Sequence, residues 1–319
     1  MKKYKSLIKK ILLGVLIATL VYFVASVIIV EIVYEQLCFN QHFDYEYTIN
    51  PREYGLVAKE TDIKASDGVK IHIYEVMVSN PKGVVIMLTG ITGPSVTHFY
   101  GEAKLVAEAG YASILVDARG HGKSEGDKIT FAIDDVKDVD ATVNYIKGHQ
   151  RYDDLPIIVM GLSMGGATAI NAGSLNQDID GIIALSPFSS WTDVCIDTVA
   201  VHGWPRWIGE LLRPGIVIHG FIRHGMDFFR IAPEKTIQQA GDKPILILRS
   251  RDDAVVTLQN QDRLDNSYNG SNMDVIIKDG DDHHVVDIKY PFKDIDYCNA
   301  ILAFLKTFNT TEEGVSYGE

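Results

Sequence analysis

The sequence predicts an α/β protein: a mostly parallel central sheet with helices on both faces, a helical cap insertion, and one transmembrane helix ahead of them. Three observations lead to this prediction. Short apolar runs alternate with segments of helical spacing from about residue 56 onward. The alternation stops between residues 187 and 233 and then resumes. Ahead of it, an uncharged apolar run is long enough to cross a bilayer.

The transmembrane helix is predicted from residues 11–30, ILLGVLIATLVYFVASVIIV, which carry no charge. A helix of this length rises about 30 Å, the thickness of the hydrocarbon core. A buried core helix and a cleavable signal peptide are the alternatives. A signal peptide has a shorter apolar region followed by a small-residue cleavage site, whereas the nearest such patch, Ala25-Ser26, lies inside the run. The sequence therefore favours an uncleaved anchor.

The charge distribution predicts the orientation of this anchor. Five lysines precede residue 11, acidic residues follow the span, and the next basic residue is Arg52. Residues 1–10 are therefore expected to be a cytoplasmic basic segment, and the rest of this single-pass cell-membrane protein to lie outside the cytoplasm. The formal net charge of the whole chain is −12. An acidic body repels phosphate backbones, so no nucleic-acid partner is expected.

The remaining chain divides into a connector, a main domain and a tail. Residues 31–55 are rich in aromatic and acidic residues without a clear period and are expected to form a juxtamembrane connector. Residues 56–309 form the main domain and residues 310–319 the tail. The three cysteines are widely spaced and fit no metal or redox motif, so neither a metal nor a cofactor is predicted, and a disulfide is neither required nor excluded.

The domain opens with a hairpin and continues as alternating strands and helices. Two β-rich runs are joined by Ser66-Asp67-Gly68, a turn signal. The following strands are continuously apolar, as expected for parallel strands that are buried on both faces. Strands are predicted at 56–65, 69–78, 83–90, 111–117, 156–161, 181–187, 243–250 and 273–280, and helices at 97–110, 134–148, 164–175 and 293–308.

The insertion at about 187–233 is predicted to consist of short helices. Open α/β sheets bind ligands at the carboxyl ends of their strands, so an insertion between two strands is placed to cover that edge as a cap. Its aromatic side chains either line a site below the cap or only pack against one another, and both can hold together. They are Trp191, Trp204, Trp207, Phe221, Phe228 and Phe229.

One stretch, IIVMGLSMGGATAI at residues 157–170, places a serine on a strand-to-helix turn. A serine hydroxyl is a poor nucleophile until a base accepts its proton, and a sharp turn exposes it for that purpose. Gly161, Gly165 and Gly166 leave room on both sides of Ser163. The helix that follows brings backbone donors to a developing negative charge. The alternative is a glycine-rich packing turn.

Five stretches in this order resemble the α/β-hydrolase superfamily of serine esterases, lipases and S33-type aminopeptidases. LTGITG (88–93) stands at the oxyanion turn, and DARGHGKSEG (117–126) at the family's D-x-R-G-x-G-x-S loop. GLSMGG (161–166) stands at the nucleophile elbow, RSRDDAVV (249–256) at the acid, and DGDDHH (279–284) at the histidine. The resemblance covers about residues 56–308 and implies an α/β-hydrolase fold.

The resemblance implies a catalytic triad in the order that this fold uses. Ser163 is the expected nucleophile, Asp253 the acid and His283 the base. The neighbours Asp252 and His284 are the alternatives. The motif spacing favours the first assignment, because Asp253 stands three residues before the motif's valine and His283 three residues after Gly280.

The oxyanion hole is expected to be formed by the backbone N–H groups of Met164 and Ile91. The sequence departs from the family pattern at Thr89, which replaces a histidine, and at Arg249-Ser250, which replace a His-Gly pair. These histidines do not carry out the chemistry, so the triad is retained. The loop at 119–121 is expected to be structural and to lie near the site.

Three functions follow from these features. The leading one is a membrane-anchored serine hydrolase that cleaves carboxylic esters, including acyl lipids, without a cofactor. The second is an S33-type aminopeptidase or amidase with the same triad, which would need acids to hold the amine of a peptide substrate. The third is a non-catalytic binding protein on a hydrolase scaffold. The acids that the cap offers to an aminopeptidase are Asp193, Asp197, Glu210 and Asp227.

Overall fold

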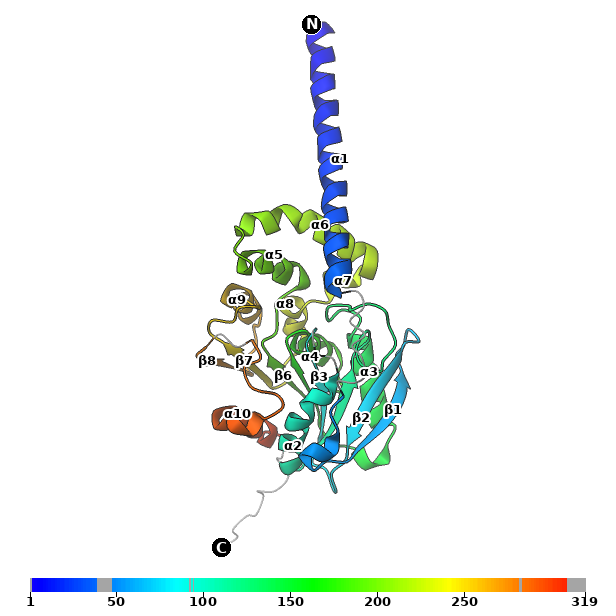
Figure 1. The fold of residues 1–319 in the computed structure, drawn as a ribbon, viewed down its shortest axis with the longest axis vertical. Helices are drawn as coiled ribbons and strands as arrows, with labels where there is room; N and C mark the ends of the chain where they lie inside the picture. The colour runs from blue at the N-terminus through cyan, green and yellow to red at the C-terminus, as the bar shows by residue number, and fades with distance from the viewer. Residues whose placement is uncertain (1, 39–47, 92, 94, 281–282, 309–319) are drawn as a thin grey trace.

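The computed structural model of the chain describes residues 2–38, 48–91, 93, 95–280 and 283–308. The predicted tail at 310–319 and part of the predicted connector, residues 39–47, lie outside these residues. The described chain consists of a long N-terminal helix that projects from an α/β domain (Figure 1).

The domain is built on one eight-stranded sheet in the order β1-β2-β4-β3-β5-β6-β7-β8. Strands β1 and β2 are antiparallel, β2 is antiparallel to β4, and all other pairs are parallel. The prediction of a mostly parallel sheet is confirmed. The strands are β1 (Ala58–Lys64), β2 (Lys70–Val76), β3 (Val84–Leu88), β4 (Ala112–Asp117), β5 (Ile157–Leu162), β6 (Gly181–Leu185), β7 (Ile245–Ser250) and β8 (Met273–Lys278).

Helices cover both faces of this sheet, and each face has its own apolar core. One core joins the sheet to α3 and α4, and the other joins it to α2 and α10. The strands between them are buried on both sides, which accounts for their continuous apolar runs. The helices are α2 (Tyr100–Glu108), α3 (Val136–Lys147), α4 (Met164–Leu175), α8 (Pro233–Thr236), α9 (Leu258–Asp265) and α10 (Ile295–Lys306), with 3₁₀ turns at Pro51–Tyr54, Val96–Phe99, Gln150–Tyr152, Ile237–Gln239 and Pro291–Lys293.

Helix α9 was not predicted from the sequence. Its segment LQNQDRLD contains only two apolar residues and therefore shows no helical hydrophobic period. The helix is fixed instead by its surroundings. Thr257 caps its N-terminus by accepting a hydrogen bond from the Asn260 N–H, and Leu264 packs into the core.

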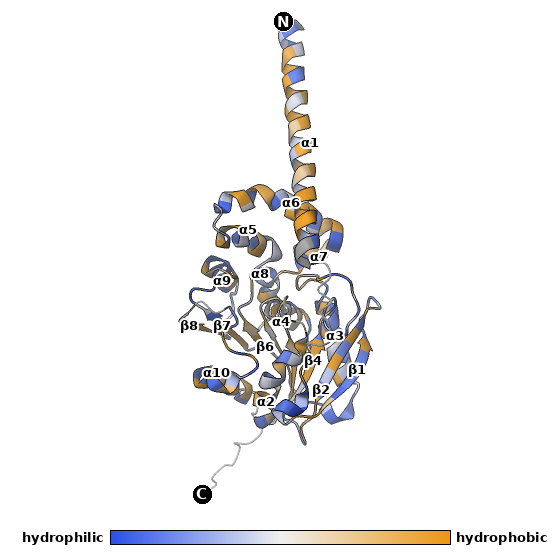
Figure 2. Cartoon of the chain, in the orientation of Figure 1, coloured by the Kyte–Doolittle hydropathy of each residue, from blue (hydrophilic) through white to orange (hydrophobic). Residues whose placement is uncertain are grey.

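The N-terminal helix α1 spans Lys2–Cys38 and is longer than the predicted transmembrane segment. Residues 31–38, the first part of the predicted juxtamembrane connector, continue this helix. No glycine or proline interrupts these residues, and acidic side chains in them pair with the domain, as described below. Beyond its first turns α1 is largely apolar (Figure 2). It is the one described helix that is long and apolar enough to cross a membrane.

The cap contains α5 (Trp191–Val201), α6 (Arg206–His224) and α7 (Asp227–Arg230). The prediction of short helices is wrong for α6, which runs for 19 residues through Pro214. Proline removes one backbone hydrogen bond and usually ends or kinks a helix. Packing against α1 on one side and α5 on the other holds α6 together across this position. Figure 1 shows α6 lying across the end of the domain from which α1 projects.

A buried carboxyl group on α2 predicts a pH-dependent stability. Glu102 is fully buried, and neither its oxygens nor the Tyr297 hydroxyl of α10 has a hydrogen bond of normal geometry. Burial raises the pKa of Glu102 from 4.5 to about 8, and the nearby Tyr297 hydroxyl lowers it by less. Because the folded-state pKa is the higher one, the protonated carboxyl stabilises the fold fully below pH 4.5, and this contribution is lost as the pH rises toward 8.

Glu102→Gln should remove this contribution to the pH dependence. We expect the free energy of unfolding of the natural chain to fall between pH 5 and 8 by up to about 1.4 kcal/mol per pH unit more than that of the variant. Urea unfolding of the detergent-solubilised chain at several pH values measures the difference. Glu108→Gln is the matched control, because Glu108 lies on the same helix but is exposed. Equal slopes for Glu102→Gln and the natural chain would contradict the prediction.

Candidate active site

The serine of the glycine-rich turn lies between β5 and α4 in a strained backbone conformation. Ser163 has φ 54° and ψ −114°, a combination that residues with a Cβ rarely adopt. Its N–H donates to the Leu185 carbonyl at 2.7 Å, which fixes the turn against β6. Strain of this kind is typical of functional sites, where the surrounding structure holds it in place.

The glycines around Ser163 are required by close backbone packing. A Cβ on Gly161 would lie 2.1 Å from the Gly165 carbonyl oxygen. A Cβ on Gly165 would lie 2.5 Å from the carbonyl oxygen of Leu88 at the end of β3. Real Cβ atoms do not approach other atoms so closely. The turn can therefore pack against the neighbouring strand only because glycine stands at these positions.

A buried carboxylate and a histidine lie in contact after β7 and β8. The Asp253 Oδ2 and the His283 Nδ1 are 2.7 Å apart. The other carboxylate oxygen, Oδ1, accepts hydrogen bonds from the N–H groups of Val255 and Val256 at 2.7 and 2.8 Å. These backbone donors fix the carboxylate, so it can hold the imidazole in one orientation and one tautomer.

The neighbouring candidates occupy different positions. Asp252 is exposed, and its N–H donates to the Gly280 carbonyl. His284 is also exposed, and its ring centroid lies 5.9 Å from that of His283. The pair that the structure brings together is therefore the one that the motif spacing favoured.

Ser163 and the Asp253–His283 pair lie at the same edge of the sheet. Ser163 follows β5, Asp253 follows β7 and His283 follows β8. The carboxyl ends of these three parallel strands lie at the same edge of the sheet. The Nε2 atom of His283 is buried and has no hydrogen-bond partner among the described residues. It is therefore not bonded to Ser163, although such contacts commonly tighten only in the complex with substrate.

The two predicted oxyanion donors belong to segments that meet at Ser163. Met164 is the first residue of α4, where backbone N–H groups have no partner within the helix. The loop after β3 approaches from the other side, since a Cβ on Gly90 would lie 3.3 Å from the Cβ of Ser163. Ile91 follows Gly90, and a turn closes from the Gly93 N–H to the Gly90 carbonyl at 3.1 Å.

The loop after β4 holds the segment of the predicted oxyanion donor Ile91 in place. His121 is fully buried, and its two ring nitrogens lie 3.1 Å from the carbonyl oxygens of Ile91 and Arg119. Asp117 accepts hydrogen bonds from the Val96 N–H at 2.8 Å and the Lys123 N–H at 3.0 Å. Sequence reasoning placed this loop near the site but missed that its side chains bind the segment that carries Ile91.

A buried ion pair anchors the same loop. The Arg119 guanidinium contacts Asp138 of α3 at 2.7 Å and Asp67 of the β1–β2 turn at 2.8 Å. Only 7% of the Arg119 side chain is exposed, and the Asp138 side chain is not exposed at all. The loop between β4 and α3 is therefore attached to the sheet edge and to one covering helix at once.

An apolar cluster lies between the cap and the predicted site. Met164, Phe131 and Phe188 belong to one buried cluster that reaches the cap and α1, and Ile91 packs against it. A cavity of about 170 Å³ continues from this cluster between α6, α7 and the domain. Its lining combines apolar side chains with the charged residues Asp193, Arg213, Glu234 and Lys235. Its lining includes Phe131, Phe188, Trp191, Val217, Phe228 and Phe229.

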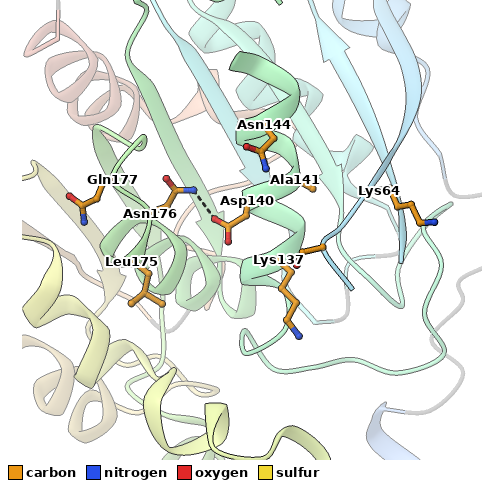
Figure 3. A pocket seen from close by; sticks show the side chains of 9 residues that line it. Lys64, Lys137, Asp140, Ala141, Asn144, Leu175, Asn176 and Gln177 are labelled. Carbon is orange, nitrogen blue, oxygen red and sulfur yellow. Dashed lines mark hydrogen bonds between the residues drawn. The ribbon is translucent and has the colours of Figure 1, made fainter. Parts of the chain in front are cut away.

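A more open pocket of about 530 Å³ lies between α3 and the end of α4 (Figure 3). Its lining is polar, and Asn176 donates a hydrogen bond to Asp140 across it at 2.7 Å. It contains none of the predicted site residues and no nucleophile paired with a base. Among the described residues, no group of three His, Cys, Asp or Glu side chains is arranged to hold a metal ion.

Comparisons with known proteins agree with this architecture. Residues 79–220 match the family described as serine aminopeptidase, S33. The chain is 25% identical over 257 residues to the Bacillus subtilis protein YqkD, covering 79% of this chain and 80% of that protein. It is 24% identical over 215 residues to the Arabidopsis thaliana α/β hydrolase domain-containing protein WAV2, covering 66% of each.

Among solved structures, the Pyrococcus furiosus esterase Pf2001 superposes with a TM-score of 0.60 at 21% identity, over 81% of this chain and 94% of that one. The Pyrococcus horikoshii acylaminoacyl peptidase superposes with a TM-score of 0.58 at 18% identity, over 81% of this chain and 43% of that one. At these identities the superpositions establish the fold. The chain therefore has the α/β-hydrolase fold, and residues 79–220 are similar to the S33 family.

Proposed function

We propose that the chain is a membrane-anchored serine hydrolase that cleaves carboxylic esters. Ser163 is the nucleophile, His283 the general base and Asp253 the group that orients it. The observation that carries the proposal is the Asp253–His283 contact of 2.7 Å, which leaves the buried Nε2 of His283 without a partner. The strained turn at Ser163 supplies the hydroxyl at the same sheet edge.

The proposed reaction has two halves. The Ser163 Oγ attacks the ester carbonyl carbon, its proton passes to His283 Nε2, and the carbonyl oxygen becomes an oxyanion bound by the N–H groups of Met164 and Ile91. The intermediate then breaks its bond to the leaving alcohol, which takes the proton from His283. Water attacks the acyl-enzyme by the same route, releasing the carboxylic acid and restoring Ser163.

We also propose that α1 is retained as the anchor, with its lysine-rich end in the cytoplasm and the domain outside it. The contacts of α1 with α6 favour retention over cleavage. The Tyr22 hydroxyl donates to the Leu211 carbonyl at 2.6 Å, and Gly215 packs directly on the backbone of Ser26. Cleavage after the apolar run would remove this part of the helix and uncover the cap.

The cap favours an ester over an aminopeptidase substrate. Asp193 pairs with Arg213 at 3.0 Å, and Asp197 pairs with Arg206 at 3.0 Å. Glu210 contacts both of these arginines. Three of the four cap acids that could hold a substrate amine are thus engaged by arginines. Five aromatic side chains line the neighbouring cavity, and they suit the acyl part of an ester.

A substrate panel tests the proposed reaction. We expect the full chain in detergent to hydrolyse p-nitrophenyl esters of graded acyl length and to leave aminoacyl p-nitroanilides intact, with Ser163→Ala as the blank. Turnover of the anilides alone would favour the S33-type aminopeptidase instead. Folded chain that reacts with no panel member and takes no fluorophosphonate label would favour the non-catalytic binding protein.

A further inference from the structure

The outward face of the cap helix α6 is apolar, which is the reverse of an ordinary surface helix. Trp207, Leu211, Phe221 and Ile222 are 62, 50, 47 and 70% exposed. At 3.6 residues per turn, their positions fall within an arc of about 100° and therefore share one side of the helix. Trp204, just ahead of α6, is 62% exposed and extends the stripe. Several large apolar side chains exposed on one side of a helix are typical of an interaction surface.

The arginine and glutamate side chains of α6 form ion pairs within the protein. Arg206 and Arg213 pair with acids of α5, and Arg223 pairs with Glu31 and, at 3.2 Å, with Glu35 of α1. Glu210 lies between Arg206 and Arg213. The apolar stripe is thus free of charge, while the charged groups join α6 to its neighbours.

The contact with α1 sets the depth of α6 relative to a membrane. If residues 11–30 fill the hydrocarbon core, Val30 lies at its boundary and Ser26 about 6 Å inside it. A Cβ on Gly215, in the middle of α6, would lie 2.6 Å from the Ser26 backbone, so α6 is at that depth. Amphipathic helices that lie in a membrane interface are buried by about 5–10 Å.

We infer that the apolar stripe of α6 lies in the bilayer leaflet from which the domain emerges, so that α1 and α6 form one membrane-bound unit. This inference rests on the proposed retention of α1 as an anchor and goes beyond it, because an anchor alone leaves the domain free above the surface. Val217 of the same helix lines the aromatic cavity next to the predicted site. The inference therefore places one side of α6 against lipid and another against that cavity.

Tryptophan quenching by brominated lipids tests the position of α6. The chain has three tryptophans, and the two outside α5, Trp204 and Trp207, carry the exposed stripe. We expect the full chain in phosphatidylcholine vesicles to lose about half of its tryptophan emission when the acyl chains are brominated close to the headgroups. The double variant Trp204→Phe/Trp207→Phe should lose little, because Trp191 remains within the cap.

A matched control places a reporter elsewhere on the surface. Tyr290→Trp in the double-variant background restores an exposed tryptophan outside the cap, and we expect it to stay unquenched. Flotation of the vesicles after a salt wash reports the anchor separately. If the protein floats but its tryptophans stay unquenched, α6 does not lie in the leaflet, whereas the proposal that α1 is an anchor is retained. Protein that does not float overturns the anchor itself, and with it the inference.

Discussion

Ser163→Ala should lower kcat/KM for an ester substrate by about 10⁴- to 10⁶-fold, because Ser163 is the serine on the strained strand-to-helix turn at the sheet edge that holds the Asp253–His283 pair. The variant should fold normally. Alanine has the same Cβ as serine, so the backbone at φ 54° is strained to the same extent in both. Steady-state hydrolysis and fluorophosphonate labelling measure the loss, and circular dichroism checks the fold.

Ser186→Ala is the matched control for this experiment. Ser186 follows the neighbouring strand β6, also has a positive φ of 46°, and its hydroxyl is buried without a hydrogen-bond partner. It differs from Ser163 in having no glycine-rich elbow around it, so its removal should leave turnover and labelling nearly unchanged. If Ser163→Ala still takes the label, or if Ser186→Ala loses it, the nucleophile is misassigned.

Asp253→Asn is expected to have the second-largest effect, a decrease of about 10⁴-fold in kcat. Asparagine keeps an oxygen that can accept from the Val255 and Val256 N–H groups, so the loop should hold its shape. What changes is the contact with His283. An amide at this position no longer stabilises the imidazolium that forms during catalysis, and it can favour the wrong tautomer.

The adjacent residue provides the control for the acid. Asp252→Asn makes the same chemical change one residue earlier, on a side chain that is exposed and away from the histidine. We expect its kcat to stay within about twofold of the natural chain. Pre-steady-state release of the leaving alcohol would show that Asp253→Asn slows the chemical steps rather than product release. Equal losses in the two variants would point to a general effect of charge at this loop.

Much of the fold follows from local patterns. The runs at 83–90, 111–117, 156–161 and 181–187 are apolar throughout because helices cover both sides of their sheet, and the structure has β3, β4, β5 and β6 there. Helix α9 was missed because its sequence is polar and it is held by a cap and one core contact. Short helices were predicted in the segment that forms α6, and packing against α1 and α5 keeps α6 continuous through Pro214.

The candidate site was predicted from motif spacing, and its assignment stays a prediction. Motif spacing could identify Asp253 and His283 because each follows a strand whose place in the chain order is set by the fold. It could not reveal that His121 and Asp117 hold the segment after β3 that contains the predicted oxyanion donor Ile91. Those contacts join loops that are 21 to 30 residues apart and depend on how two loops at one sheet edge pack.

The sequence by itself determined the elements whose signal is local: the apolar span of α1, the buried strands and the glycine-rich turn at Ser163. Hydrophobic periodicity, charge and turn chemistry are properties of neighbouring residues, so they can be read along the chain. The tertiary structure alone decided that α1 packs on α6, with Glu31 paired to Arg223 and Ser26 against Gly215. That contact joins residues about 190 positions apart. With α6 in this position, one apolar face of the helix is exposed, although the sequence led us to expect its aromatic side chains inside the cap.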